Sequence, residues 1–351
     1  MPQNAIGLGV RTPIERIQTV TQIFAVLIKE LQKANVPVVL IGAPENGEAD
    51  APLVRLLLDP ESPGTYVQVD KTEYSVAAIR DYTGALPSQG VPTLNETEVR
   101  AATADKFVLS DILGEDGLPT TLLEAGENLS TQIRDFDNGP YIVKPVHGVM
   151  AKGVEIIRTL EQADKSYAKK MIIQPYVDTT QMPKQLVGIG DFYAGLVATE
   201  GVPKEIRMFS YRFADGETDM LPLLRVSKTV GILLDDHYVI IEPESVPDEA
   251  YALARRAFDK IAAYTGIPHM HGAIDIIWLD GAFRVMEINT REPALPKMKK
   301  DKEGEDAEGK IARVSLGLLT RQLVARQLVG LAVDKQPTVI DKTLPNVLKY
   351  T

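Results

Sequence analysis

The sequence has no cysteine among its 351 residues. This absence excludes a disulfide framework, a thiolate metal site and a cysteine nucleophile. Apolar runs long enough to span a bilayer are missing too, and the first residues do not show the basic-then-apolar pattern of a secretion signal. We therefore expect a cytoplasmic protein with no membrane partner.

An excess of positive charge is also absent. Lysine and arginine number 38 against 48 aspartate and glutamate residues, which gives a formal net charge of −10. Proteins that bind nucleic acid in general need a basic surface, so we expect no nucleic-acid partner. A local basic pocket for a small phosphate ligand remains compatible with this charge.

Signals of several other function classes are missing. Gly7 and Gly9 do not form a phosphate-binding glycine fingerprint, because they come too early and no predicted strand precedes them. No serine and histidine form a convincing nucleophile–base pair, and the chain has no internal repeat. Its composition is that of an ordinary globular protein, with 44% hydrophobic and 25% charged residues. A chain of this length exceeds what one hydrophobic core normally serves, so we expect two or three domains.

The first hundred residues are predicted to form a small α/β unit. A capping-box pattern at 12–15 (TPIE) begins a helix whose apolar residues recur at helical spacing as far as Leu31. The run 36–41 (VPVVLI) is typical of a buried parallel strand. We expect a further strand at Tyr66–Val69 and a helix at Tyr74–Tyr82.

The segment Gly272–Pro293 (GAIDIIWLDGAFRVMEINTREP) has the composition of a β-hairpin. Two apolar runs flank an Asp-Gly dipeptide, which is a favoured turn sequence. Asp275, Glu287 and Asn289 lie within these two strands at even separations. Such oxygen-bearing side chains are the ligands that Mg²⁺ prefers, usually as one or two carboxylates plus substrate phosphates.

The turn decides whether these three side chains share a face, because side chains alternate along a strand. A three-residue loop from Leu279 to Gly281, with the glycine in the left-handed conformation, puts all three on one face. A two-residue turn puts Asp275 on the opposite face from Glu287. We expect the three-residue loop and a magnesium site. The alternative, an ordinary solvated acidic face, is disfavoured because both neighbours of Glu287 are apolar.

A second set of residues points to an anionic ligand. Tyr141–Pro145 is a predicted strand with Lys144 in its apolar run, and lysine is rarely buried without a partner. Either the amine reaches water at the strand end, or it is aimed at an anion. The loop His147–Gly153 favours the anion, because its two glycines and Lys152 can fold over phosphates and offer backbone N–H groups. It returns into a strand at Val154–Ile157.

Two downstream strands carry further candidates. Met171–Val177 is predicted to end in an extended segment that can bind the edge of adenine, and Asp178 can bind ribose hydroxyls. Glu205–Phe209 carries Arg207, whose partner is either a phosphate or acyl phosphate, or a carboxylate in a structural salt bridge. We do not expect Glu205 to be that carboxylate, on the argument that neighbours in one strand face opposite ways.

The remaining segments are less informative. A helix is expected from Pro247 to Tyr264, ended by Gly266. We interpret His269 and His271 as part of the connection that follows, rather than as a transition-metal site. The charged segment 297–310 predicts a solvated, mobile loop, with a substrate lid as the alternative. An amphipathic helix at 311–328 and a loosely tied tail complete the chain.

The order of these features resembles the ATP-grasp superfamily. Lys106, Lys144, the glycine loop, the hinge strand, Arg207 and the Asp…Glu-x-Asn set occur in the order and approximate spacing of that family. The stretch GVPTLNETEVRAATADK, residues 90–106, resembles the segment that precedes its first nucleotide lysine. The resemblance covers about residues 90–294. It is to carboxylate–amine ligases such as glutathione synthetase, D-alanine–D-alanine ligase and the ribosomal-protein glutamate ligases.

This resemblance implies an α/β and α+β fold, in which two α+β subdomains grip ATP behind a Rossmann-like N-terminal α/β domain. The implied division is 1–103 for the N-terminal domain, 104–180 for the central subdomain, 181–330 for the C-terminal subdomain with the magnesium site, and 331–351 for a tail. Dimers are usual in the similar families.

The resemblance also implies residue roles. Lys106 and Lys144 would contact the α- and β-phosphates, Gly148 to Gly153 would cover the triphosphate, and the backbone of Pro175 and Val177 would bind adenine. The implied ATP-binding residues are Lys106, Lys144, Gly148, Lys152, Gly153, Gln174, Pro175, Tyr176, Val177 and Asp178. Asp275, Glu287 and Asn289 would hold two Mg²⁺, with Mn²⁺ as a substitute. Arg207 and Arg291 would steady the transferred phosphoryl group or a substrate carboxylate.

The sequence departs from the family pattern in places. The glycine loop is poorer in glycine and serine than in many relatives and carries His147. Gln174 replaces the acid often found at the hinge. The ribose contact can belong to Gln181 instead of Asp178. Asn-Thr-Arg after Glu287 is as similar to the carboxylase-like and amino-acid-ligase branches as to the glutathione synthetase branch, so the subfamily stays open.

The implied function is ATP-dependent ligation of a small-molecule carboxylate to an amine through an acyl phosphate, with release of ADP and phosphate. Two alternatives share the ATP site. One is a carboxylate kinase or carboxylase-type enzyme, and the other is a non-catalytic, ATP-binding regulatory protein. The sequence names neither the acid nor the amine.

Overall fold

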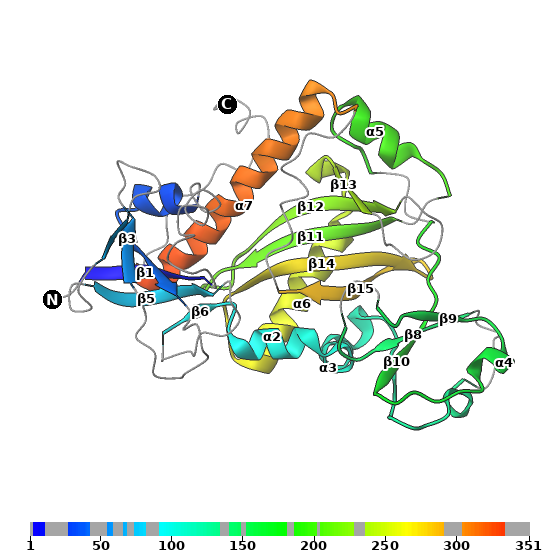
Figure 1. Ribbon diagram of the computed structural model, residues 1–351. Coiled ribbons are helices and arrows are strands. Elements are labelled where there is room, and N and C mark those ends of the chain that lie inside the picture. Colours follow the sequence, from blue (N-terminus) through cyan, green and yellow to red (C-terminus); the bar gives the residue numbers. More distant parts are fainter. Residues whose placement is uncertain are drawn as a thin grey trace.

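The computed structural model describes residues 3–10, 27–42, 55–58, 66–68, 74–81, 91–133, 140–148, 152–180, 186–201, 204–227, 236–290 and 304–333. The strands in these ranges form three β-sheets (Figure 1). None of the helices in the same ranges is long and apolar enough to cross a membrane.

The first sheet has the strand order β4-β3-β2-β1-β5-β6. In that order its strands are Tyr66–Gln68, Arg55–Leu58, Val38–Gly42, Gln3–Val10, Tyr74–Asp81 and Thr93–Leu94. The strands β2, β1, β5 and β6 are parallel, whereas β3 and β4 are antiparallel additions. The predicted parallel strand after the first helix is therefore confirmed. Residues 27–33 of that helix are described, but its predicted capping box at 12–15 lies outside the described residues.

The predicted helix at Tyr74–Tyr82 is wrong, because Tyr74–Asp81 is the strand β5. It pairs with β1 on one side and β6 on the other, and its central Ala78 and Ile79 are buried. A short segment such as YSVAAIRD, with an apolar centre, fits a helix or a strand equally well in isolation. Here the segment is a strand because it pairs with a neighbouring strand along each edge, and such tertiary contacts override local propensity.

The second sheet is antiparallel, with the order β7-β10-β8-β9. Its strands are Thr121–Leu123, Met171–Pro175, Tyr141–Pro145 and Glu155–Ile157. One face buries a small apolar cluster that includes Leu123, Val143, Ile157, Met171 and Ile173. Side chains alternate, so the opposite face carries Lys144, which is paired with Ile172.

Two short helices precede this sheet, α2 (Thr97–Ala104) and α3 (Lys106–Leu113). Asp105 caps α3, since its carboxylate accepts hydrogen bonds from the backbone of Phe107 at 2.9 Å and Val108 at 3.0 Å. The helix α4 (Leu160–Ala163) and the 3₁₀ turns at Gly114–Asp116, Leu129–Thr131 and Pro243–Ser245 complete the short elements.

The third sheet is antiparallel, with the order β13-β12-β11-β14-β15. Its strands are Asp236–Ile240, Thr218–Ser227, Lys204–Arg212, Met270–Leu279 and Ala282–Asn289. The helix α6 (Asp248–Thr265) packs against β11, β14 and β15, and it lies behind the sheet in Figure 1. Gly266 ends α6 at a φ of +72°, as predicted from the sequence.

The helix α7 (Ala307–Val333) runs from α5 (Gly190–Ala198) to the first sheet (Figure 1). It packs against β1 and β5 as well as β11 and β13, so it joins the first and third sheets. The predicted helix at 311–328 is confirmed and is longer than expected.

The charged segment 297–310 was predicted to be a mobile loop, which is wrong for its described part, residues 304–310. Asp306 accepts hydrogen bonds from the backbone of Gly309 and Phe192, both at 2.7 Å, and so ties the first turn of α7 to α5. Glu305 is ion-paired with the buried Arg313 at 3.0 Å. Charge alone did not show that these acids have partners within the fold.

Candidate active site

The hairpin of β14 and β15 turns in two residues, Asp280 and Gly281. Leu279 pairs with Ala282, and the two turn residues have φ values of +50° and +80°. The predicted three-residue loop is therefore wrong. The predicted left-handed conformation of Gly281 is correct.

A β-bulge at Met286 nevertheless puts the three oxygen donors on one face. Ile276 pairs with Val285, whereas Asp275 pairs with Glu287, so Met286 has no partner in the ladder. This extra residue reverses the alternation that the two-residue turn sets up. Asp275 and Glu287 are therefore directly opposite each other, and Asn289 lies two residues further on the same face. Glu287 and Asn289 are half-buried, and Asp275 is completely buried.

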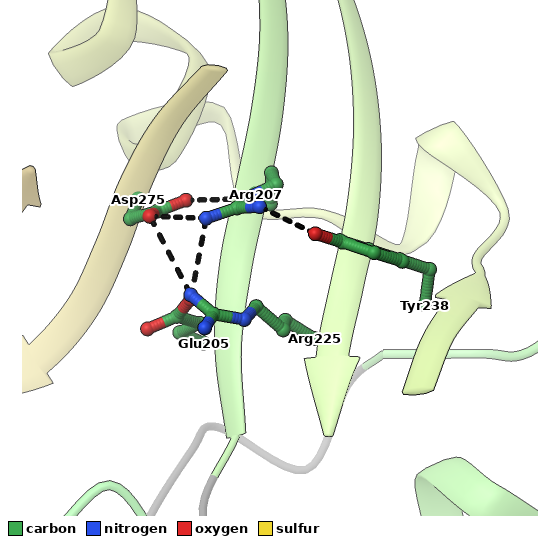
Figure 2. A network of polar contacts seen from close by, with 5 residues as sticks. All are labelled: Glu205, Arg207, Arg225, Tyr238 and Asp275. Carbon is green, nitrogen blue, oxygen red and sulfur yellow. Dashed lines mark hydrogen bonds and ion pairs between the residues drawn. The ribbon is translucent and has the colours of Figure 1, made fainter. Parts of the chain in front are cut away.

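Arg207 lies beside Asp275 on this face (Figure 2). Its Nε donates to Oδ1 at 2.6 Å and its Nη2 to Oδ2 at 2.5 Å, while Nη1 donates to the hydroxyl of Tyr238 at 2.7 Å. The structural salt bridge that the sequence left open is thus present. It does not exclude a metal, because a carboxylate offers about four lone-pair sites and the arginine uses two.

Glu205 is the second acid of this network, so the prediction that it could not be a partner of Arg207 is wrong. The two residues are two positions apart on β11 and share a face, and the Arg207 Nη2 lies 3.9 Å from the Glu205 Oε1. Glu205 also accepts a hydrogen bond from Arg225. It is completely buried, and burial together with the charge of Asp275 raises its pKa to about 8.

Sequence reasoning missed Arg225 and Tyr238 as well. Arg225 lies across from Glu205 on β12, and its Nη1 is 3.7 Å from the Asp275 Oδ2. Its signal was present, because a charge inside the apolar strand LPLLRVS is the same feature that singled out Lys144 and Arg207. Tyr238 carried no such signal, since tyrosine is common in strands.

Lys144 connects the second sheet electrostatically to this network. Burial lowers the pKa of Lys144 to about 8, the charges of Glu287 and Glu205 act in the opposite direction, and the charge of Lys106 adds to the lowering. Charges influence one another in this way only over short distances. Lys144 is therefore close to Lys106, Glu205 and Glu287, although these residues come from different parts of the chain.

The glycine loop begins beside these lysines. The Lys106 ammonium donates to the backbone oxygen of Gly148 at 2.9 Å. Gly153 has a φ of +76°, which favours glycine, and a Cβ there would lie only 3.1 Å from the Pro145 side chain. Lys152 is exposed. Residues 149–151 of the loop lie outside the described residues.

The hinge residues follow at the end of β10. Gln174 is buried, and Pro175 is the last residue of the strand. The backbone N–H of Tyr176 donates to the Pro140 oxygen at 2.9 Å, so it is not available to a ligand. Val177 is half-buried. The exposed Asp178 accepts hydrogen bonds from the backbone and hydroxyl of Thr180, at 3.0 and 2.6 Å. The alternative ribose residue, Gln181, lies outside the described residues, as does Arg291.

The expectation that both histidines of the His-x-His pattern lie in the connection after the helix is correct for His269 and wrong for His271. His269 precedes β14, and His271 lies within it, buried, with its Nδ1 3.2 Å from the Gln327 Oε1. Among the described residues no group of three or more His, Asp or Glu side chains could hold a metal. The candidate magnesium set is instead two carboxylates and one amide, a hard-oxygen set that phosphate oxygens and water would complete.

Comparisons with known proteins support the fold. No protein-family model and no curated protein matches the sequence. Solved structures do: VanG D-Ala:D-Ser ligase from Enterococcus faecalis matches with a TM-score of 0.53 and 12% identity, over 95% of this chain and 100% of that one. D-alanyl-alanine synthetase A from Vibrio cholerae O1 biovar eltor str. N16961 matches with a TM-score of 0.51 and 14% identity, over 93% and 99%.

A RimK domain ATP-grasp protein from Sphaerobacter thermophilus DSM 20745 matches with a TM-score of 0.51 and 13% identity, over 92% of this chain and 98% of that one. At such identities a structural likeness shows the fold, and these likenesses extend over nearly the whole of each chain. The chain therefore has the mixed α/β fold of these solved structures, one of which is an ATP-grasp protein, in agreement with the fold that the sequence resemblance implied.

Proposed function

We propose that this protein is an ATP- and Mg²⁺-dependent ligase that joins a small-molecule carboxylate to an amine. One observation carries the proposal: Lys144 is within electrostatic reach of both Lys106 and Glu287, and Glu287 shares a sheet face with Asp275 and Asn289. Cations for phosphates and oxygen donors for a metal thus occur together, within a fold whose solved examples include ligases.

The chemistry needs no nucleophilic side chain. A carboxylate does not react with an amine at neutral pH, because its carbonyl is electron-rich and its leaving group would be oxide. In the proposed first step a carboxylate oxygen attacks the γ-phosphorus of ATP and ADP leaves, which gives an acyl phosphate. The amine then attacks the acyl carbon, phosphate leaves with the bonding pair, and the amine loses a proton to form the amide.

The protein's task is to align these groups and neutralise charge. In the proposal Lys106 and Lys144 bind phosphate oxygens, and the loop from Gly148 to Gly153 covers them. The hinge from Gln174 to Asp178 holds adenine and ribose. Arg207, with Arg291, steadies the transferred phosphoryl group or the substrate carboxylate.

The proposed metal ligands are Asp275, Glu287 and Asn289. Mg²⁺, or Mn²⁺ in its place, would neutralise the charge that develops on the phosphate oxygens. The donor set fits such a hard cation, and Arg207 keeps the carboxylate of Asp275 oriented with lone pairs to spare.

Release of ADP under three conditions tests the proposal. The purified protein is given Mg²⁺ and ATP, first alone, then with a panel of carboxylic acids including D-alanine and D-serine, and then with the same acids plus amines. The panel contains these two amino acids because related structures are ligases of D-Ala and D-Ser. Release that depends on both acid and amine supports the ligase.

The same measurement separates the alternatives. Release that needs only the acid indicates a carboxylate kinase, and tight ATP binding without release indicates a regulatory protein. A Glu249→Ala variant is the matched control, because Glu249 is an exposed acid in the first turn of α6. It should release ADP at the rate of the unchanged protein.

A further inference from the structure

The side chain of Gln174 lies on the same face of the second sheet as Lys144. Lys144 pairs with Ile172, and Gln174 is two residues further along β10. The intervening Ile173 points the other way, into the apolar cluster with Val143. If phosphates lie at Lys144, Gln174 is placed about 7 Å further along the strand, on the side of the hinge.

Thr120 determines the orientation of the Gln174 amide. The Thr120 hydroxyl donates its single hydrogen to the Leu118 carbonyl at 2.8 Å, so its oxygen can only accept from Gln174. The atom facing it at 2.7 Å must therefore be the donor, Nε2. This order of hydrogen bonds excludes the flipped amide, which would set two acceptors against each other.

The Gln174 carbonyl oxygen is then left as an acceptor that no described residue uses. Gln174 is only 5% exposed. Its Oε1 accepts no hydrogen bond from any described residue, yet it is not among the completely buried polar atoms that lack partners. A nearly buried side chain thus presents one acceptor of fixed orientation that the described residues leave open.

We infer that Thr120 is a positioning residue for nucleobase selection. It holds Nε2 of Gln174, so that Oε1 accepts a hydrogen bond from the 6-amino group of adenine and is repelled by the 6-oxo group of hypoxanthine or guanine. This inference rests on the proposed function, because it needs a purine nucleotide at the hinge. It adds the selection of 6-amino over 6-oxo purines, and it assigns that selection to a residue that does not touch the base.

Binding of ATP and ITP tests the inference, since both carry the same ribose and triphosphate and differ only at the 6-position and its neighbouring N1. Dissociation constants are measured by calorimetry with Mg²⁺. The unchanged protein should bind ATP about tenfold more tightly than ITP or better, the usual effect of a lost hydrogen bond that leaves two acceptors facing each other. Thr120→Val keeps the shape but removes the hydroxyl, so the amide can rotate, and the preference should fall to about threefold or less.

Two further variants separate positioning from a loss of packing. Thr120→Ser retains the hydroxyl and should restore the preference. Ser110→Ala is the matched control, because Ser110 also donates to the Leu118 oxygen, at 3.1 Å, but has no hydrogen bond to Gln174. It should leave the ATP to ITP ratio unchanged. If Thr120→Val does not fold, Gln174→Met removes the acceptor directly and should abolish the preference.

The outcomes distinguish this inference from the proposed function. Equal binding of ATP and ITP by the unchanged protein, or full preference in Thr120→Val or Gln174→Met, overturns the inference and leaves the ligase proposal standing. Absence of binding by either nucleotide overturns both. A preference that Thr120→Val loses and Thr120→Ser keeps supports the inference.

Discussion

Arg207 and Asp275 lie directly opposite each other on β11 and β14, and the guanidinium holds both carboxylate oxygens, at 2.6 and 2.5 Å. The carboxylate is completely buried, so this bidentate pair supplies the charge compensation that an isolated buried anion would lack. It also orients Asp275 on the face that Glu287 shares. Removing either charge should therefore affect stability and the proposed metal site together.

Arg207→Ala should destabilise the fold strongly. The substitution leaves Asp275 buried without its principal partner, and breaking a buried pair costs about 3–5 kcal/mol. The free energy of unfolding, measured by urea titration, gives the change directly. Arg256→Ala is the comparison, because Arg256 pairs with Asp116 at 2.8 Å but is largely exposed, and such pairs contribute about 1 kcal/mol or less. Equal losses in the two variants would contradict the role given to the buried pair.

Lys144 should make nucleotide binding depend on pH. Burial lowers its pKa to about 8, so its charged fraction falls from about nine-tenths at pH 7 to about one-tenth at pH 9. We expect the affinity for ATP to fall about tenfold over this range. In Lys144→Arg the charge persists at both pH values, and this fall should disappear. Identical pH profiles for the two proteins would rule out Lys144 as the titrating contact.

The same lowered pKa has a consequence for stability. Between about pH 8 and the ordinary lysine value of 10.5, the unfolded chain binds more protons at Lys144 than the folded chain does. The free energy of unfolding should therefore rise as the pH increases across that window. As the pH falls towards 8, this stabilisation by Lys144 is lost. Thermal unfolding of Lys144→Met should lack this rise. A rise that persists in the variant must come from other groups.

The two-residue turn of the hairpin predicts a purely local effect of Gly281→Ala. No atom lies within 4 Å of a Cβ at Gly281, so the cost comes only from its φ of +80° and should be about 1–2 kcal/mol. Gly195→Ala in α5 is the control. It also has free space around its Cβ but no positive φ, and it should be neutral or stabilising by up to about 1 kcal/mol. Chemical denaturation measures the change in the free energy of unfolding for both variants. Equal changes in the two variants would contradict a turn in which Gly281 has a positive φ.

Asn95 should be a strong determinant of stability although it lies far from β14 and β15 in sequence. Its Nδ2 donates to the His271 and Thr290 oxygens at 2.8 and 2.6 Å, and its Oδ1 accepts from the His271 N–H at 2.8 Å. Asn95→Ala leaves three buried backbone groups without a partner, a loss of roughly 3 kcal/mol or more. Thr103→Val removes a hydroxyl that contacts the Thr290 hydroxyl and donates to the Val99 oxygen, both at 3.0 Å, but it leaves the three backbone groups paired and should cost about 1 kcal/mol. A small loss in Asn95→Ala would mean that water replaces the amide there.

The hairpin shows how far the sequence could predict the candidate site. The even spacing of Asp275, Glu287 and Asn289 within apolar strands predicted their common face, and the pairing confirms it. The loop length was wrong, and a two-residue turn alone would have separated Asp275 from Glu287. The bulge at Met286 puts Asp275 and Glu287 back on the same face of the sheet. A bulge is one extra residue in a ladder, and its position depends on the partner strand, so the residue itself carries no signal.

Other errors have different causes. Glu205 was excluded although positions two apart in a strand share a face, so the correct conclusion was available from the sequence. That Arg207 pairs with Asp275 was not available, because the two residues are 68 positions apart and meet only through the strand order of the third sheet. The burial of Glu305 beside Arg313 likewise depends on how α7 docks, which the local charge pattern does not contain.

Binding of Mn²⁺ in the presence of a non-hydrolysable ATP analogue, followed by electron paramagnetic resonance, tests the proposed site most directly. The unchanged protein and Glu249→Gln should bind the metal equally well. Glu287→Gln should bind it at least about tenfold more weakly, because the variant replaces a charged carboxylate ligand by a neutral amide. The amide has nearly the same shape, so the thermal unfolding should be that of the unchanged protein. Undiminished Mn²⁺ binding by Glu287→Gln would contradict the placement of the metal at Asp275, Glu287 and Asn289.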